Sequence, residues 1–461
     1  MTRCLPCPPT RVLLTAGLLA ATGFCAPWAA AQDLFSVTAT GGGSTVTASD
    51  ENLLDLLEDA IETQGAFNPL VGSDITAVLR YADVENAIVV TLNAAETQAT
   101  LSFPGTGFSQ VFNGSDADDL ENEIERFIEE DGGQAFAEFL ADLNQRSLLA
   151  VLDGNPFSTT ALTNEHLFDL YGLGLSGPRL GAGPLGGGGG GSGSEQPLDA
   201  GYVVYDYDGA RTEVDQDTGT YTTNYEQAWF SVTPRISSLD AAGFDGVSAS
   251  LGLAAGWWFT DWIGISVGGD VSTNDFDGTT TFHSSFHLAL PIQPIDTFDE
   301  QGFGFALGVT PFVLSGVGGS VEAAAGGAFN GYGGALNATV GLGHVQFRGA
   351  AQIIEFNDQD LDFGDFEFET ELNQSAVTVG GNLRVYLDGP NGHWWVDGGL
   401  TYVEYLDDAA VSDWLRPEVG VGWRWGGNSR VRVAYRDLIA EADDGRDFDA
   451  TSITANVVFS Y

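Results

Sequence analysis

The chain lacks side chains that most proteins use. It contains no lysine, so every one of its 16 basic residues is an arginine. Its three cysteines, Cys4, Cys7 and Cys25, all precede residue 32, where we expect an export signal to be cleaved. The mature chain then has no thiol, which excludes disulfides, thiolate metal sites and cysteine nucleophiles.

Positive charge is also scarce. The 64 acidic residues give a formal net charge of −48 at pH 7. Such a chain repels phosphates, so we expect no nucleic-acid partner and no docking onto anionic lipid head groups. The sequence also shows no motif for a cofactor or a metal ion, and we expect neither.

Long apolar runs are confined to the N-terminus. Residues 1–31 combine Arg3 and Arg11 with the apolar run from Val12 to Ala21 and small residues at 29–31. This pattern predicts a secretory signal peptide. No later run approaches the roughly 20 apolar residues of a membrane helix.

The composition divides the mature chain into three regions. Residues 33–180 combine helical periodicity, as in 115–133, with short β-like runs at 75–81, 87–93 and 98–104, which predicts a small α+β domain. Residues 181–198 contain six consecutive glycines and predict a linker. From residue 199 to 461, period-two segments alternate with Gly, Asp and Asn turns, as in all-β proteins.

The alternation favours a transmembrane barrel over a soluble β-sandwich or β-helix. In residues 416–425, Val419, Val421 and Trp423 share one face, and Arg416 and Glu418 share the other. Several aromatics lie close to strand ends, including Tyr405, Trp414 and Trp425. Apolar-out, polar-in strands with aromatic rims are typical of outer-membrane barrels, and the length predicts about 12 strands.

The last strand carries a more specific signal. Five residues alternate on one face up to a terminal aromatic: Ile453, Ala455, Val457, Phe459 and Tyr461. This pattern resembles the C-terminal strand of Gram-negative outer-membrane β-barrel proteins. The resemblance implies a mainly β fold in the cell outer membrane, with outer-membrane lipid and the barrel-assembly machinery as partners. An even strand number places both barrel ends in the periplasm, so we expect a periplasmic N-terminal domain with a possible partner there.

Arginines are the most informative polar residues of the predicted barrel. Strand parity places six of them opposite the apolar face, as one wall of the lumen: Arg384, Arg416, Arg424, Arg430, Arg432 and Arg436. Acidic residues of other segments are expected to face them across a water-filled pore: Asp206, Asp208, Asp270, Asp275 and Asp277. The alternative is a filled barrel in which the arginines pair with carboxylates.

Two further groups were considered for chemistry. Asp358, Asp360 and Asp362 alternate as in a calcium loop, but Phe363 stands where that motif needs glycine, which favours a solvated acidic loop. His283, Ser285 and His287 share a strand face. They lack the asparagine after serine that membrane phospholipases carry, so we expect no enzyme.

We therefore expect a porin-like channel or a passive barrel with a periplasmic domain. The alternative is a translocator barrel of the autotransporter type that exports its N-terminal domain. The short passenger and the polyglycine segment before the barrel, where that family has a helix through the pore, weaken the alternative.

Overall fold

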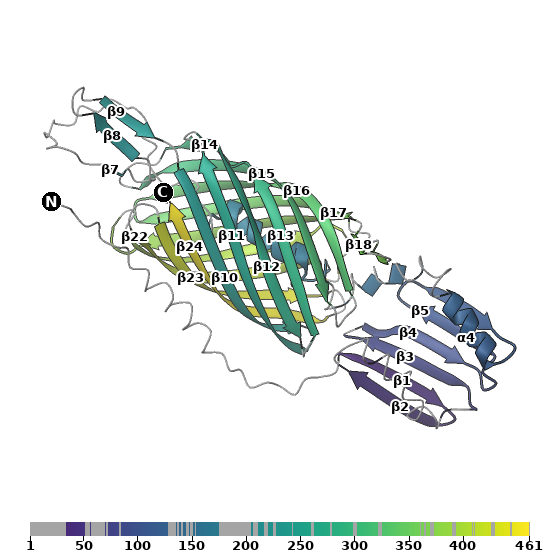
Figure 1. Cartoon of the computed structure of the whole chain (residues 1–461). Coiled ribbons are helices and arrows are strands. Elements are labelled where there is room, and N and C mark those ends of the chain that lie inside the picture. The colour runs from purple at the N-terminus through teal and green to yellow at the C-terminus, as the bar shows by residue number, and fades with distance from the viewer. Residues whose placement is uncertain are drawn as a thin grey trace, which may run out of the picture. The chain divides into compact units, whose positions relative to one another are not determined.

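The computed structural model describes residues 34–50, 72–127 apart from 83, 151–174 apart from 153, most of 204–460, and single positions between 56 and 147. The predicted signal peptide, the linker at 181–198 and Tyr461 lie outside the described residues. The described chain is mainly β and contains an N-terminal sheet and a closed C-terminal barrel (Figure 1).

The N-terminal sheet has six antiparallel strands in the order β2-β1-β3-β4-β5-β6. The predicted strands correspond to β3 (Ile75–Tyr81), β4 (Val84–Leu92) and β5 (Gln98–Phe103), and three more are present: β1 (Phe35–Gly41), β2 (Ser44–Asp50) and β6 (Phe108–Asn113). Helix α4 (Ala117–Arg126) packs Leu120 against Ala99 and Phe112 of this sheet. Its N-cap is Asp116, whose side chain accepts a hydrogen bond from the Asp119 amide.

The barrel has 12 antiparallel strands, as predicted. β13 and β14 both pair with β15 and follow each other in the chain, so they form one interrupted strand. β10 pairs with β24 and closes the barrel. The strands are β10 (Gln227–Ala241), β11 (Phe244–Trp258), β12 (Gly264–Phe276), β13 (Thr279–Ala289), β14 (Ile292–Asp296), β15 (Phe303–Ser320), β16 (Ala325–Leu342), β17 (Val345–Gln359), β20 (Asn373–Tyr386), β21 (Trp394–Tyr405), β22 (Asp413–Trp425), β23 (Ser429–Glu441) and β24 (Asp447–Ser460).

Side chains alternate between an apolar outer face and a polar interior. Val419 is 58% exposed and Val421 46%, whereas their neighbours Arg416 and Glu418 are buried. Lipid suits such an outer face, and closure leaves no unpaired strand edge. Tyr405 and Trp414 depart from the expected aromatic rim: both are buried and pack against each other with ring centroids 5.2 Å apart.

The barrel begins later than residue 199. Residues 204–224 form a separate three-stranded sheet of β7 (Val204–Tyr205), β8 (Arg211–Asp215) and β9 (Thr220–Asn224). In the acidic segment, β18 (Leu361–Phe363) and β19 (Phe366–Phe368) form a short hairpin outside the barrel sheet. The two-residue period of the region from residue 199 does not tell which sheet a strand joins. The acidic segment was expected to be a solvated loop and contains this hairpin instead. Among the described helices, none has the length and apolar character needed to cross a membrane.

Candidate functional site: a helix in the barrel lumen

The interior of the barrel holds a helical segment from the region that the sequence assigned to the soluble domain. Helix α6 (Thr159–Leu167) continues directly into the π-helical turn η3 (Phe168–Gly172). Ser158 caps the start, where its side chain accepts a hydrogen bond from the Ala161 amide. Figure 1 shows these blue coils enclosed by the strands. The predicted domain boundary at residue 180 is therefore too late, because residues 159–172 belong to the barrel interior.

Helix α6 has no apolar stripe. Its buried residues lie all around it and include Thr160, Thr163 and Asn164 beside Ala161 and Leu162. A helix with polar residues on every side is stable in a buried position only if its surroundings are polar as well. The barrel interior meets this condition, because its wall carries Gln, Asn, Thr and Arg side chains.

The contacts of the segment show the direction in which it crosses the barrel. We call the end where β10 begins and β24 ends the terminal end. At the opposite end, the Val411 amide donates to the Gly154 carbonyl at 3.1 Å, and the Phe157 ring packs near those of Phe276 and Phe448. These three wall residues lie in or beside the turns far from Ser460.

The other end of the segment lies at the terminal end of the barrel. Arg348, near the start of β17, donates to the Leu173 carbonyl at 3.1 Å. Arg430, near the start of β23, donates to the Gly174 carbonyl at 3.2 Å. The chain therefore enters the lumen at the opposite end and leaves it at the terminal end, where β10 starts.

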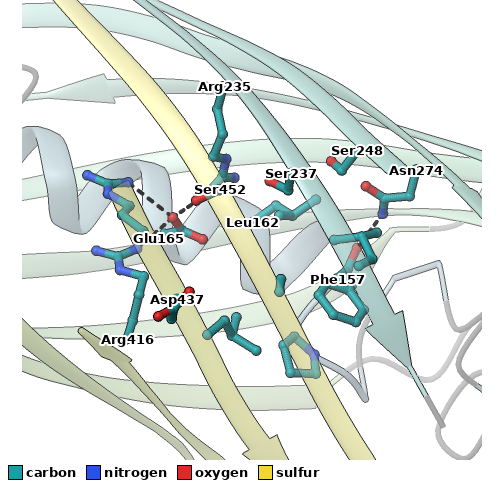
Figure 2. A pocket seen from close by; sticks show the side chains of 15 residues that line it. Phe157, Leu162, Glu165, Arg235, Ser237, Ser248, Asn274, Arg416, Asp437 and Ser452 are labelled. Carbon is teal, nitrogen blue, oxygen red and sulfur yellow. Dashed lines mark hydrogen bonds and ion pairs between the residues drawn. The ribbon is translucent and has the colours of Figure 1, made fainter. Parts of the chain in front are cut away.

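Two carboxylates on the segment meet arginines of the wall. Glu165 and Asp169 are four residues apart and point the same way. Arg416 contacts Glu165 at 2.7 Å and Asp169 at 2.7 Å, and Arg436 contacts Asp169 at 2.6 Å. Arg235 also pairs with Glu165, which Figure 2 shows between Arg235 and Arg416. Three strands and the helix thus share one buried ion cluster.

Arg384 and Arg432 pair with carboxylates of the wall itself. Asp397 contacts Arg432 at 2.6 Å and Arg384 at 3.4 Å, and Glu418 contacts Arg432 at 3.0 Å. Glu418 also accepts from Arg436 at 2.9 Å. Directly opposite positions on neighbouring strands bring these charges together, as in the pair Arg384 and Asp397.

The acidic partners therefore differ from those expected. They come from the lumenal segment and from β21 and β22, on the same side as the arginines. Asp270 instead accepts a hydrogen bond from Ser285, and Asp275 is exposed on the outer face, where Thr280 donates to it at 3.2 Å. Asp206, Asp208 and Asp277 lie outside the described residues.

Neutral hydrogen bonds extend along the whole segment. Thr159 Oγ1 lies 2.7 Å from His283 Nδ1, and Asn164 donates to Thr378 at 2.8 Å. The Tyr171 hydroxyl lies 2.6 Å from that of Ser266. Because buried polar groups need partners, these contacts let the helix and the wall satisfy each other.

Glycines of the wall make room for the segment. A Cβ on Gly318 would lie 2.6 Å from Val151 and would also meet Thr159 Oγ1. A Cβ on Gly380 would lie 3.0 Å from the Phe168 ring. The wall is thus shaped around this particular helix. A cavity lined by Glu165, Arg235 and Arg416 measures about 30 Å³, room for roughly two water molecules.

The structure places the predicted site residues as follows. Arg384, Arg416, Arg430, Arg432 and Arg436 are buried on the inner face, and Arg424 is half-buried there. In the last strand, Ile453 is 46% exposed on the outer face, which Ala455, Val457 and Phe459 share. His283, Ser285 and His287 also face the lumen. Sequence reasoning missed Glu165 and Asp169, although their four-residue spacing after the Ser158 cap was visible.

Comparisons with known proteins concern the barrel. No family model and no curated protein matches the chain. The β domain of the Bordetella autotransporter BrkA shares 10% identity at a TM-score of 0.37, covering 51% of this chain and 100% of that one. An outer membrane channel from Pseudomonas putida shares 14% at 0.37, covering 54% and 100%. The translocator domain of autotransporter NalP from Neisseria meningitidis shares 10% at 0.34, covering 51% and 89%.

The closed ring of 12 strands and its outward apolar face place the C-terminal half of the chain among the β-barrels of the outer membrane.

Proposed function

We propose that this protein is an outer-membrane barrel of the autotransporter type, which holds its own upstream chain in the lumen and displays residues 34–127 on the cell surface. The direction of residues 151–174 through the barrel carries this proposal. Gly154 lies at the opposite end of the lumen and Gly174 at the terminal end.

The even strand number indicates which end of the barrel faces the periplasm, and therefore on which side of the membrane the segment enters the lumen. The first and last strands meet at the terminal end, which faces the periplasm in barrels inserted from that side. The chain that precedes residue 151 then leaves the barrel on the outer side. The proposal thus differs from the periplasmic location that the sequence predicts for the N-terminal domain. Helix α6 also supplies a helix inside the barrel, the feature whose expected absence weakened the autotransporter alternative.

A second candidate is a channel that the helix closes reversibly. The buried arginines of the inner wall support it, since they would line an aqueous passage if the helix left. The filled lumen favours the first candidate, because Arg416 and Arg436 already have carboxylate partners on the helix.

Cysteine labelling on intact cells tests the proposal, because the mature chain has no thiol of its own. Single cysteines are introduced by Ser109→Cys in the N-terminal sheet, Glu441→Cys at the opposite end of the barrel and His393→Cys in a turn at the terminal end. All three positions are exposed. A maleimide that does not cross membranes is added before and after permeabilisation.

The proposal predicts that Ser109→Cys and Glu441→Cys react on intact cells and that His393→Cys reacts only after permeabilisation. If Ser109→Cys is protected in the same way as His393→Cys, the N-terminal domain is periplasmic and the export proposal is wrong.

A further inference from the structure

Two histidines from different parts of the chain meet inside the barrel. His166 is on helix α6 and His287 is on β13. Their ring centroids are 5.6 Å apart and their planes are inclined by 49°. The edge of the Tyr171 ring packs against His287, with centroids 5.5 Å apart.

Most of the ring nitrogens of this pair have no hydrogen-bond partner among the described residues. His287 is 0% exposed, and neither its Nδ1 nor its Nε2 makes a hydrogen bond. The buried Nε2 of His166 also lacks a hydrogen-bond partner. Leaving a buried polar atom unsatisfied is unfavourable, so such atoms indicate a missing partner.

A third buried histidine of the lumen, His283, differs from the pair. It lies four residues before His287 on the same face of β13 and is also buried. Its Nδ1 meets Thr159 at 2.7 Å, and its Nε2 meets Asn274 at 3.0 Å. Both ring nitrogens of His283 thus have hydrogen-bond partners, unlike those of His287.

Two glycines of the wall make room for the rings of the pair. Gly252 and Gly268 face the lumen from the neighbouring strands β11 and β12. A Cβ on Gly252 would lie 2.6 Å from His166 Cε1, and one on Gly268 would lie 2.8 Å from His287 Cε1. The two imidazoles occupy the volume that side chains at these positions would fill.

The separation of the rings fits a shared metal ion. Two imidazoles that each bind one ion through a nitrogen at about 2.0–2.1 Å have ring centroids roughly 5–6 Å apart at tetrahedral to trigonal angles. Imidazole is a preferred ligand of zinc, copper and nickel.

We propose that a divalent transition-metal ion binds between His166 and His287 and fastens the lumenal helix to the barrel wall, with water in its remaining positions. The half-buried His166 gives the ion a route from the lumen. The site rests on the helix being inside the barrel, whichever side the N-terminal domain occupies. Its failure would therefore leave the export proposal untouched.

Copper is the best probe, because Cu²⁺ binds such ligands most tightly among these ions. The full-length chain in detergent is mixed with Cu²⁺ and separated from free metal, and bound copper is measured by mass spectrometry. Electron paramagnetic resonance then reports the nitrogen ligands. His166→Gln and His287→Gln each remove one ligand. His393→Gln changes an exposed histidine in a turn and is the matched control.

The wild type and His393→Gln are expected to retain about one copper ion per chain, with nitrogen ligation and a higher thermal midpoint. Each of the other variants is expected to lose at least tenfold in affinity and the shift in midpoint. Circular dichroism checks that the variants fold. A wild type that retains no copper, or a His287→Gln variant that binds like the wild type, would overturn the site.

Discussion

Asp169 on the lumenal helix and Arg416 on β22 form a buried ion pair at 2.7 Å, with side chains only 6% and 4% exposed. The pair connects a segment upstream of the barrel to a strand almost 250 residues later. Removing one partner of such a pair leaves a buried charge without its counter-ion, which is more costly than losing a surface contact.

Neutralising Asp169 should therefore destabilise the protein. Asp169→Asn is expected to lower the free energy of unfolding by about 3 kcal/mol, because Arg416 and Arg436 lose a shared partner. Glu123→Gln removes an exposed pair with Arg126 and should change it by less than about 1 kcal/mol. Denaturant unfolding in detergent measures both. Equal effects would show that the lumenal pair is not buried.

Reversing both charges should expel the helix. Glu165→Arg combined with Asp169→Arg places two cations against Arg235, Arg416 and Arg436. We expect conductance steps in a planar bilayer from this variant and almost none from the wild type. The neutral pair Glu165→Gln and Asp169→Asn is the control, since it loses attraction without adding repulsion. A wild type that conducts as well as the reversed variant would favour an open pore.

Adding a methyl group at Gly318 should loosen the helix. The Cβ of Gly318→Ala meets Thr159 and Val151, and overpacking of this kind costs about 1–3 kcal/mol. Gly349→Ala is the control, because a Cβ there meets nothing within 4 Å. Proteolysis of residues 151–174 reports the effect. Gly318→Ala should be cut faster than Gly349→Ala, and equal rates would argue against a close fit.

An added charge at an exposed position should destabilise the barrel but not the N-terminal sheet. Val433 on β23 is 45% exposed, and Val111 in the N-terminal sheet is 49% exposed. Val433→Arg places a cation in lipid and is expected to cost about 2–4 kcal/mol. Val111→Arg places it in water and should cost less than about 0.5 kcal/mol. Unfolding from lipid vesicles measures both, and similar costs would mean that Val433 does not face lipid.

The barrel was predictable because strand alternation depends only on local sequence. Val421 and Arg424 are three residues apart, so they lie on opposite faces of any strand that contains both. The apolar valine indicates the face toward lipid, and the charged arginine indicates the face toward the lumen. The inward direction of Arg416 and Arg436 follows from the same rule. Their partners do not, because sequence parity gives no information on what fills the lumen.

The lumenal helix was missed for a physical reason. Helices in water-soluble domains are usually recognised by an apolar stripe. Helix α6 has none, because the barrel wall surrounds it on all sides and carries many polar side chains. The strands between residues 204 and 224 were assigned to the barrel because they carry the expected alternation. Their alternation is real, but β8 and β9 pair outside the barrel sheet.

A disulfide between the helix and the wall tests the central claim most directly. Thr159 and Gly318 lie so close that Thr159→Cys with Gly318→Cys should form a cross-link in the outer membrane of intact cells. Thr159→Cys with Gly349→Cys, whose second position faces outward, should stay reduced. If the first pair also stays reduced under oxidising conditions, or both pairs cross-link equally, the helix does not occupy the lumen as described.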